Sequence, residues 1–101
     1  MTARVGSDLL LRGTVTVDGA TEDLSTASAY QIWVRLPDGE TKSSYSTSFT
    51  NDGTDGIVEA GVPDTDNDTP GTLKWWAKFT RANGAVIVSD PASVTVKRAG
   101  D

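Results

Sequence analysis

The sequence contains no cysteine and no histidine. Without cysteine, neither disulfides nor thiolate metal sites can support the structure, so the core has to be held together by packing alone. The same two absences remove the usual base near neutral pH and the most reactive nucleophile. No serine lies in a Gly-x-Ser-x-Gly elbow, and no pair of acids has the apolar setting that raises one pKa. We therefore expect no enzymatic activity and no cofactor.

Long apolar runs are also missing. The first twelve residues offer only Leu9, Leu10 and Leu11, which is too short for a signal-peptide core or a membrane span, so we expect no export by that route. No longer window repeats its apolar residues with helical spacing, whereas valine, threonine and serine dominate the segments with regular patterns. These features predict a β fold.

Basic residues are scarce, and the formal net charge is −5. Phosphate binding needs a cationic surface that releases counterions, so we expect no nucleic-acid partner. The charge is also unevenly spread, with twelve acids and four bases in residues 1–70 but five bases and two acids in residues 71–101. This asymmetry indicates either solvated acidic loops beside a mildly basic hairpin, or a head-to-tail contact between unlike patches.

A chain of 101 residues suits one domain with one hydrophobic core. We expect this domain to span residues 1–101, with flexible ends at 1–7 and 98–101. Strand-like segments recur about every ten residues with turn residues between them, as in a sandwich or small barrel. The expected strands are 8–17, 29–36, 41–50, 57–62, 72–80, 85–88 and 92–97.

Alternation within the segments predicts the core residues, and the residues between the segments predict the turns. In the most regular segment, 72–80, the inward positions are Leu73, Trp75, Ala77 and Phe79, and in 41–50 the expected core anchors are Tyr45 and Phe49. The Pro-Asp-Gly at 37–39 suits a tight hairpin turn, because proline presets the first turning dihedral and glycine accepts a positive one. Pro91 implies an edge, a bulge or a switch between sheets. The predicted fold is all-β, an antiparallel immunoglobulin-like β-sandwich of about seven strands without a disulfide.

Two tryptophans occupy outward positions in this alternation. Trp33 and Trp76 fall on the polar faces of their strands, where large aromatic side chains are costly to leave in water. The proposed interface consists of Trp33, Arg35, Lys74, Trp76 and Lys78, and we expect it to contact another subunit. A register error, or a loop folded over the indoles, would explain the same pattern without a partner.

An acidic trio, Asp64, Asp66 and Asp68, has the alternate spacing with which a calcium loop begins. Thr69 and Trp75 stand where such a loop needs a glycine and a glutamate. The three residues are therefore weak candidates for a metal site, and the favoured interpretation is an exposed acidic loop with no metal.

The order of several turn motifs resembles that of small immunoglobulin-like β-sandwich structural proteins of tailed bacteriophages, including the N-terminal domain of baseplate upper proteins. The motifs are Leu-Arg-Gly-Thr-Val-Thr-Val-Asp-Gly (11–19), Asp-Leu-Ser (23–25), Leu-Pro-Asp-Gly (36–39), Thr-Asn-Asp-Gly-Thr-Asp-Gly (50–56), Pro-Gly-Thr-Leu-Lys-Trp (70–75) and Ala-Asn-Gly (82–84). Together they cover nearly the whole chain, and Trp76 departs from the pattern by doubling the expected aromatic residue.

The resemblance implies a multi-copy structural protein of a virion, made in the host cytoplasm and placed in a tail, baseplate or neck, or decorating the capsid. Its implied partners are other virion proteins and further copies of itself, with no membrane and no catalytic residue. The alternative from the residues alone is a carbohydrate-binding module in which Trp33 and Trp76 form a stacking platform for sugar rings.

Overall fold

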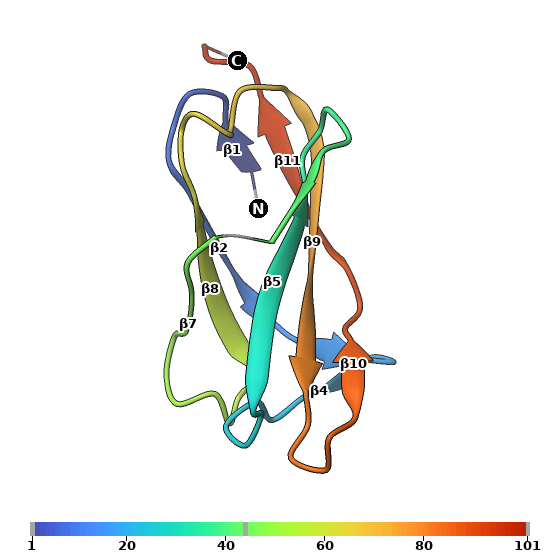
Figure 1. Ribbon diagram of the computed structural model, residues 1–101. Helices are drawn as coiled ribbons and strands as arrows, with labels where there is room; N and C mark the ends of the chain where they lie inside the picture. Colours follow the sequence, from blue (N-terminus) through green and yellow to red (C-terminus); the bar gives the residue numbers. More distant parts are fainter. Residues whose placement is uncertain (1, 44, 101) are drawn as a thin grey trace.

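The computed structural model describes residues 2–43 and 45–100, and over these residues the chain is all-β with no helix (Figure 1). This part of the chain accordingly holds no helix that could span a membrane. Eleven strands form a six-stranded sheet, a three-stranded sheet and a two-stranded hairpin. The two larger sheets lie in separate layers, and the hydrophobic core fills the space between them.

The six-stranded sheet is built around the longest strand, β9. Its strands are β1 (Thr2–Arg4), β11 (Ala92–Lys97), β9 (Gly71–Thr80), β5 (Ala29–Arg35) and β6 (Thr41–Lys42) in spatial order, with β10 (Val86–Val88) also paired to β9. All of its pairings are antiparallel except that of β1 with β11, which is parallel. β9 therefore has a neighbouring strand along both of its edges.

The second layer is smaller. Its three strands are β2 (Leu9–Thr14), β8 (Ile57–Val62) and β7 (Thr47–Phe49), and the separate hairpin consists of β3 (Thr16–Val17) and β4 (Ala20–Thr21). All these pairings are antiparallel. The predicted all-β class with antiparallel sheets is confirmed.

The alternation predicted for 72–80 is confirmed, because Leu73, Trp75, Ala77 and Phe79 are all buried. The ring of Trp75 lies against Gly13 of the opposite layer, where a Cβ would stand only 2.7 Å from Trp75 Cζ2. The turn at 37–39 is also confirmed, since the Leu36 N–H donates to Glu40 O at 2.8 Å and Gly39 has φ of 93°. This hairpin joins β5 to β6.

The segment 41–50, expected as one strand, is divided between the two layers. β6 pairs with β5 in the six-stranded sheet, whereas β7 pairs with β8 in the three-stranded sheet. Tyr45 and Phe49 pack against the core but are only partly buried. Their anchoring differs: the Tyr45 hydroxyl donates to Asp66 Oδ2 at 2.9 Å, and Phe49 stacks on Tyr30 with ring centroids 4.5 Å apart.

The segment 8–17, also expected as one strand, is interrupted at Val15. The Val15 N–H donates to Gly56 O at 2.8 Å and its carbonyl accepts from the Glu22 N–H at 3.0 Å. The chain thereby leaves the β2–β8 ladder and enters the hairpin of β3 and β4. Val15 is buried where the chain passes from one pairing to the other, so the alternation of inward and outward residues continues through it. The sequence pattern therefore shows no break at this point.

Within the end expected to be flexible, residues 1–7, of which residue 1 lies outside the described residues, Thr2–Arg4 form β1 beside β11. The buried Asn67 holds the turn that follows: its Nδ2 donates to Arg4 O at 2.7 Å and to Ser7 O at 2.9 Å. The Gly6 N–H donates in turn to Asn67 O at 2.8 Å. The acidic loop of Asp64, Asp66 and Asp68, expected to be exposed, thus also supplies a buried polar group to the N-terminal turn.

The interruption before Pro91 does not move the chain to another sheet, because β10 and β11 pair with the same strand, β9. At the break, the Ser89 N–H donates to Ala77 O at 2.8 Å, and the Ala77 N–H donates to the Ser89 hydroxyl at 2.8 Å. The serine side chain replaces a backbone acceptor, so the buried Ala77 amide keeps a hydrogen-bond partner.

Candidate functional site

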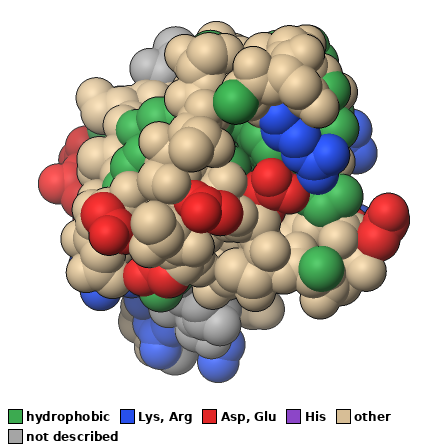
Figure 2. Space-filling model, turned by 90° about the horizontal axis from the view of Figure 1, so that it is seen from below, with side chains coloured by type: hydrophobic (Ala, Val, Ile, Leu, Met, Phe, Trp, Pro, Cys, Tyr) green, Lys and Arg blue, Asp and Glu red, His purple; other side chains and the backbone are tan. Residues whose placement is uncertain are grey.

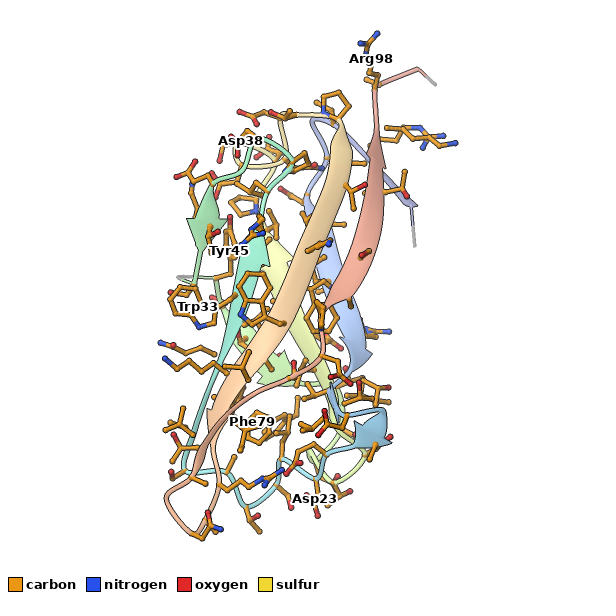
Figure 3. All side chains as sticks on the ribbon, turned by 90° about the vertical axis from the view of Figure 1, so that its right-hand side faces the viewer. Asp23, Trp33, Asp38, Tyr45, Phe79 and Arg98 are labelled. Atoms are coloured by element: carbon orange, nitrogen blue, oxygen red, sulfur yellow. The ribbon has the colours of Figure 1, made fainter. Side chains whose placement is uncertain are left out.

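All five residues of the predicted interface project from the outer side of the six-stranded sheet, which faces the viewer in Figure 3. Trp33 of β5 lies directly opposite Trp76 of β9, and Arg35 lies opposite Lys74. Lys78 is two positions along β9 from Trp76, so it projects on the same side. The sequence alternation therefore gathers these residues on one surface, which we call the cationic face.

The two indoles are less exposed than the sequence predicts. Both Trp33 and Trp76 are only partly accessible, and Trp33 Nε1 is buried without a hydrogen-bond acceptor among the described residues. The Arg35 guanidinium lies over the Trp76 ring, with Cζ 5.8 Å from the ring centroid, a cation–π geometry. The indoles therefore lie on the predicted side of the sheet but are partly covered there, because alternation fixes the side of a sheet and not what neighbouring side chains cover.

The most exposed large apolar side chains on the cationic face are Val86 and Val88 of β10, at 59% and 58%. In the ladder, Val86 lies opposite Thr80 and Val88 opposite Lys78, so both valines share the face of the lysine. These two valines were not among the predicted interface residues. The signal was present, because Ile87 packs on the core and its two neighbours must then point outward.

A shallow depression of about 290 Å³ lies in this face. It is lined by Arg35, Lys74, Trp76, Val88, Ser89 and Pro91. Its walls are thus apolar in the middle and cationic on one side. Such a surface suits an apolar group that carries a negative charge beside it.

The cations of this face lie apart from the carboxylates of the described residues. Among the described residues, no carboxylate lies within 4.0 Å of Arg35, Lys74 or Lys78, whereas three of the cations elsewhere are paired. The pairs are Arg12–Glu59 at 2.9 Å, Lys42–Asp66 at 3.1 Å and Arg81–Glu22 at 2.9 Å. In a chain with a net charge of −5, a face with three unpaired cations and no acid on its strands is a concentrated local field.

The acidic trio does not converge on one point. Asp66 accepts hydrogen bonds from Lys42 Nζ at 3.1 Å and from the Tyr45 hydroxyl at 2.9 Å, and these two donors lower the pKa of its carboxyl. Burial and the bond to Asp66 raise the pKa of the Tyr45 phenol. The Asp64 N–H donates to Asp8, and the Asp68 carboxylate accepts from the Thr69 hydroxyl; the described residues contain no group of three potential metal-ligating side chains.

A second depression, about 270 Å³, lies at the end of the molecule that Figure 2 shows, where several acidic side chains are visible. Glu22 and Arg81 both line it, and the guanidinium holds both carboxylate oxygens, at 2.9 and 3.3 Å. A carboxylate fixed in this way is an acceptor and a structural anion. Both of its oxygens are engaged by the one guanidinium.

No protein-family model and no curated protein matches this chain. The resemblance to phage structural proteins therefore stays a prediction from turn motifs. The structure shows one surface that turn motifs do not predict. It brings together on the cationic face three residues that are far apart in the sequence, Trp33, Trp76 and Val88.

Proposed function

We propose that the protein is an immunoglobulin-like β-sandwich that acts as a non-enzymatic docking subunit of a bacteriophage virion. The observation that carries the docking role is the cationic face: apolar side chains surrounded by Arg35, Lys74 and Lys78, none of which has a carboxylate partner in the described part of the chain. A partner that covers this face would bury the valines and bring acids to the three cations.

Physical chemistry favours a protein partner for such a surface. Interface centres are enriched in tryptophan and arginine and depleted in lysine, which lies more often at the rim. The arrangement here follows that order in part, because Trp76 and Arg35 stack beside the depression and Lys78 lies further along β9, while Lys74 also lines the depression. Covering exposed valines favours a complex because it removes apolar area from water.

The absence of catalysis is supported by residue chemistry. The chain has neither histidine nor cysteine, so any proton transfer would fall to carboxyl groups. Among the described residues, the carboxyl groups with displaced pKa values, Asp23, Asp52, Asp66 and Asp90, are all lowered by hydrogen bonds. A general acid near neutral pH needs the opposite shift.

The virion assignment is supported by the motif order, and the immunoglobulin-like assignment by the two layers of β-strands. Two of the motifs fall at hairpin turns of the structure, with Pro-Asp-Gly between β5 and β6 and Ala-Asn-Gly between β9 and β10. A module built for repeated assembly needs a rigid scaffold with functional side chains on strands, and the cationic face meets this requirement.

A carbohydrate-binding role is the alternative. It needs flat indole faces open to a sugar ring, whereas both indoles are partly covered and the exposed apolar surface belongs to Val86 and Val88. The geometry therefore favours docking over sugar stacking.

The test is a charge reversal on the cationic face. The variant Lys74→Glu/Lys78→Glu, mixed with the structural proteins encoded beside this chain in its genome, should lose complexes that native mass spectrometry detects with the unaltered protein. Lys97→Glu/Arg98→Glu, which changes the charge equally near the chain end, should keep them. Retention of the unaltered protein on immobilised polysaccharide, with no complex formed with any particle protein, would establish the sugar-binding alternative instead.

A further inference from the structure

The exposed large apolar side chains fall on two opposite surfaces. Among the described residues they are Val86, Val88 and Leu10, the last 47% exposed. The two valines lie on the cationic face, whereas Leu10 projects from the outer side of the three-stranded sheet. The outer sides of the two layers point in opposite directions in Figure 1, so these surfaces cannot cover one another within one molecule.

The surface around Leu10 is hollow. Leu10 lies opposite Gly61 of β8, and a Cβ placed on Gly61 would meet nothing within 4 Å. The resulting notch has a volume of about 460 Å³. It is lined by Asp8, Leu9, Leu10, Ser46, Gly61, Val62 and Pro63.

The charge of the notch is opposite to that of the cationic face. Asp8 is the charged residue of its lining, and Asp64 lies beside it, because the Asp64 N–H donates to Asp8 Oδ1 at 2.9 Å. Both aspartates are exposed. Further along the same surface, Arg12 is neutralised by Glu59. The notch therefore combines an apolar floor with two carboxylates at its rim.

We propose that a second copy of this chain occupies the cationic face, with Val86 and Val88 of one copy seated in the Gly61 notch of the next. Lys74 and Lys78 then lie toward Asp8 and Asp64 of that copy. The inference rests on the proposed docking function and names its partner. Two cationic faces pressed together would oppose like charges, so the contact is head to tail, and a head-to-tail contact repeats into a row or ring.

The test uses one variant for each surface. Gly61→Ile fills the notch at a position with open space, and its β-branched side chain suits a strand. Val88→Glu removes an apolar side chain from the other surface and places a carboxylate against Asp8. Each variant alone should weaken self-association, measured by sedimentation velocity and native mass spectrometry, by about tenfold or more relative to the unaltered protein.

The decisive sample is the mixture of the two variants. Gly61→Ile keeps an intact cationic face and Val88→Glu keeps an intact notch, so the mixture should form one-to-one dimers and nothing longer. Controls are Thr14→Ile on the same strand as Leu10 and Thr95→Glu on the same sheet as Val88, both of which should associate within about twofold of the unaltered protein. Circular dichroism verifies folding, and Leu10→Lys replaces Gly61→Ile if that variant does not fold.

Three outcomes would overturn the inference: an unaltered protein that stays monomeric at all concentrations, a mixture that does not dimerise, or a single variant that still dimerises by itself. The test of the docking function is independent of the test of the head-to-tail contact. If the unaltered protein is monomeric but still binds particle proteins through Lys74 and Lys78, the cationic face docks a different subunit and only the head-to-tail contact is wrong.

Discussion

Two glycines in the three-stranded sheet have opposite roles. Gly13 faces the core, and its missing side chain makes room for the Trp75 ring of the other layer. Gly61 faces outward, and its missing side chain leaves the notch open. Neither glycine has a positive φ, so in both cases space, not backbone conformation, explains the residue.

This contrast predicts opposite effects of the same substitution. Gly13→Ala should lower the free energy of unfolding by about 1–3 kcal/mol, because the new methyl group displaces a packed indole. Gly61→Ala should be neutral or stabilising by up to about 1 kcal/mol, since alanine reduces the freedom of the unfolded chain. Urea denaturation of both variants measures the difference; equal effects would show that Trp75 moves aside without loss.

Asp90 ties the β3–β4 hairpin to the chain between β10 and β11. Its carboxylate accepts from the Gly19 N–H at 2.9 Å, the Thr16 hydroxyl at 3.0 Å and the Asp18 N–H at 3.3 Å. These bonds, that of Gly19 foremost, lower the pKa of Asp90. The charge thus stabilises a turn in which Asp18 has φ of 52°.

The pH dependence of this contribution has a definite sign. A folded-state pKa below the unfolded value of about 3.9 gives stability that is present above that value and is lost as pH falls through the folded pKa. Asp90→Asn should therefore be less stable than the unaltered protein at pH 6, and the gap should narrow toward pH 2. Thermal unfolding of both proteins across this range checks it; a gap independent of pH would show that the carboxylate charge contributes nothing.

At the scale of elements, β9 is the centre of the structure. It pairs with β5 along one edge and with β11 and β10 along the other, and its inward side chains are buried. The short strands β6, beside β5, and β10, beside β9, have two and three residues and lie at sheet edges. Local opening therefore requires the least free energy at the edges and the most in β9.

Amide hydrogen exchange should follow this order. The amides of β9 from Leu73 to Phe79 should exchange slowest, at rates set by global unfolding, while amides of β6 and β10 exchange through local opening. NMR in deuterated water measures the rates residue by residue. Equal protection of β10 and β9 in the isolated protein would contradict this ranking.

The sequence predicted elements well where one pattern sufficed. Alternation in 72–80 identified the strand and all its core residues, and Pro-Asp-Gly identified the hairpin between β5 and β6. It failed where a segment changes layer without a change of pattern, as in 41–50 and at Val15. It also missed Asn67, because a buried polar residue in a loop is recognised only by the backbone groups it satisfies.

The candidate site was predictable in part for a similar reason. Alternation on β5 and β9 was enough to place Trp33 and Trp76 on one side of a sheet. The contribution of Val86 and Val88 depended on the pairing of β10 with β9, and the notch depended on the pairing of Leu10 with Gly61. Pairing brings distant segments together, and a single strand pattern does not contain it.

At the scale of the whole molecule, shape constrains how copies assemble. The protein measures 46 × 24 × 23 Å, with the strands running roughly along the long axis in Figure 1. The cationic face and the notch lie on the two flanks, so head-to-tail copies add along a short axis. Twice the short axis nearly equals the long axis, and a dimer is therefore less elongated than the monomer.

Small-angle X-ray scattering should show this change of shape. As concentration rises, the apparent mass should double while the maximum dimension increases only slightly, and it should grow steadily only from the third copy onward. Contact through the ends of the sandwich would instead nearly double the maximum dimension at the dimer stage. That result would exclude the two flanks as the contacting surfaces.

The placement of the three indoles also makes the chain its own optical reporter. Trp75 is enclosed against Gly13, whereas Trp33 and Trp76 border the surface where a partner would lie. In the variant Trp33→Phe/Trp76→Phe, tryptophan fluorescence would come from Trp75 in the core alone and would report unfolding by denaturant. In the variant Trp75→Phe, fluorescence would come from Trp33 and Trp76 on the outer surface, and its wavelength would report association. Unfolding and association could thus be followed separately with the two variants.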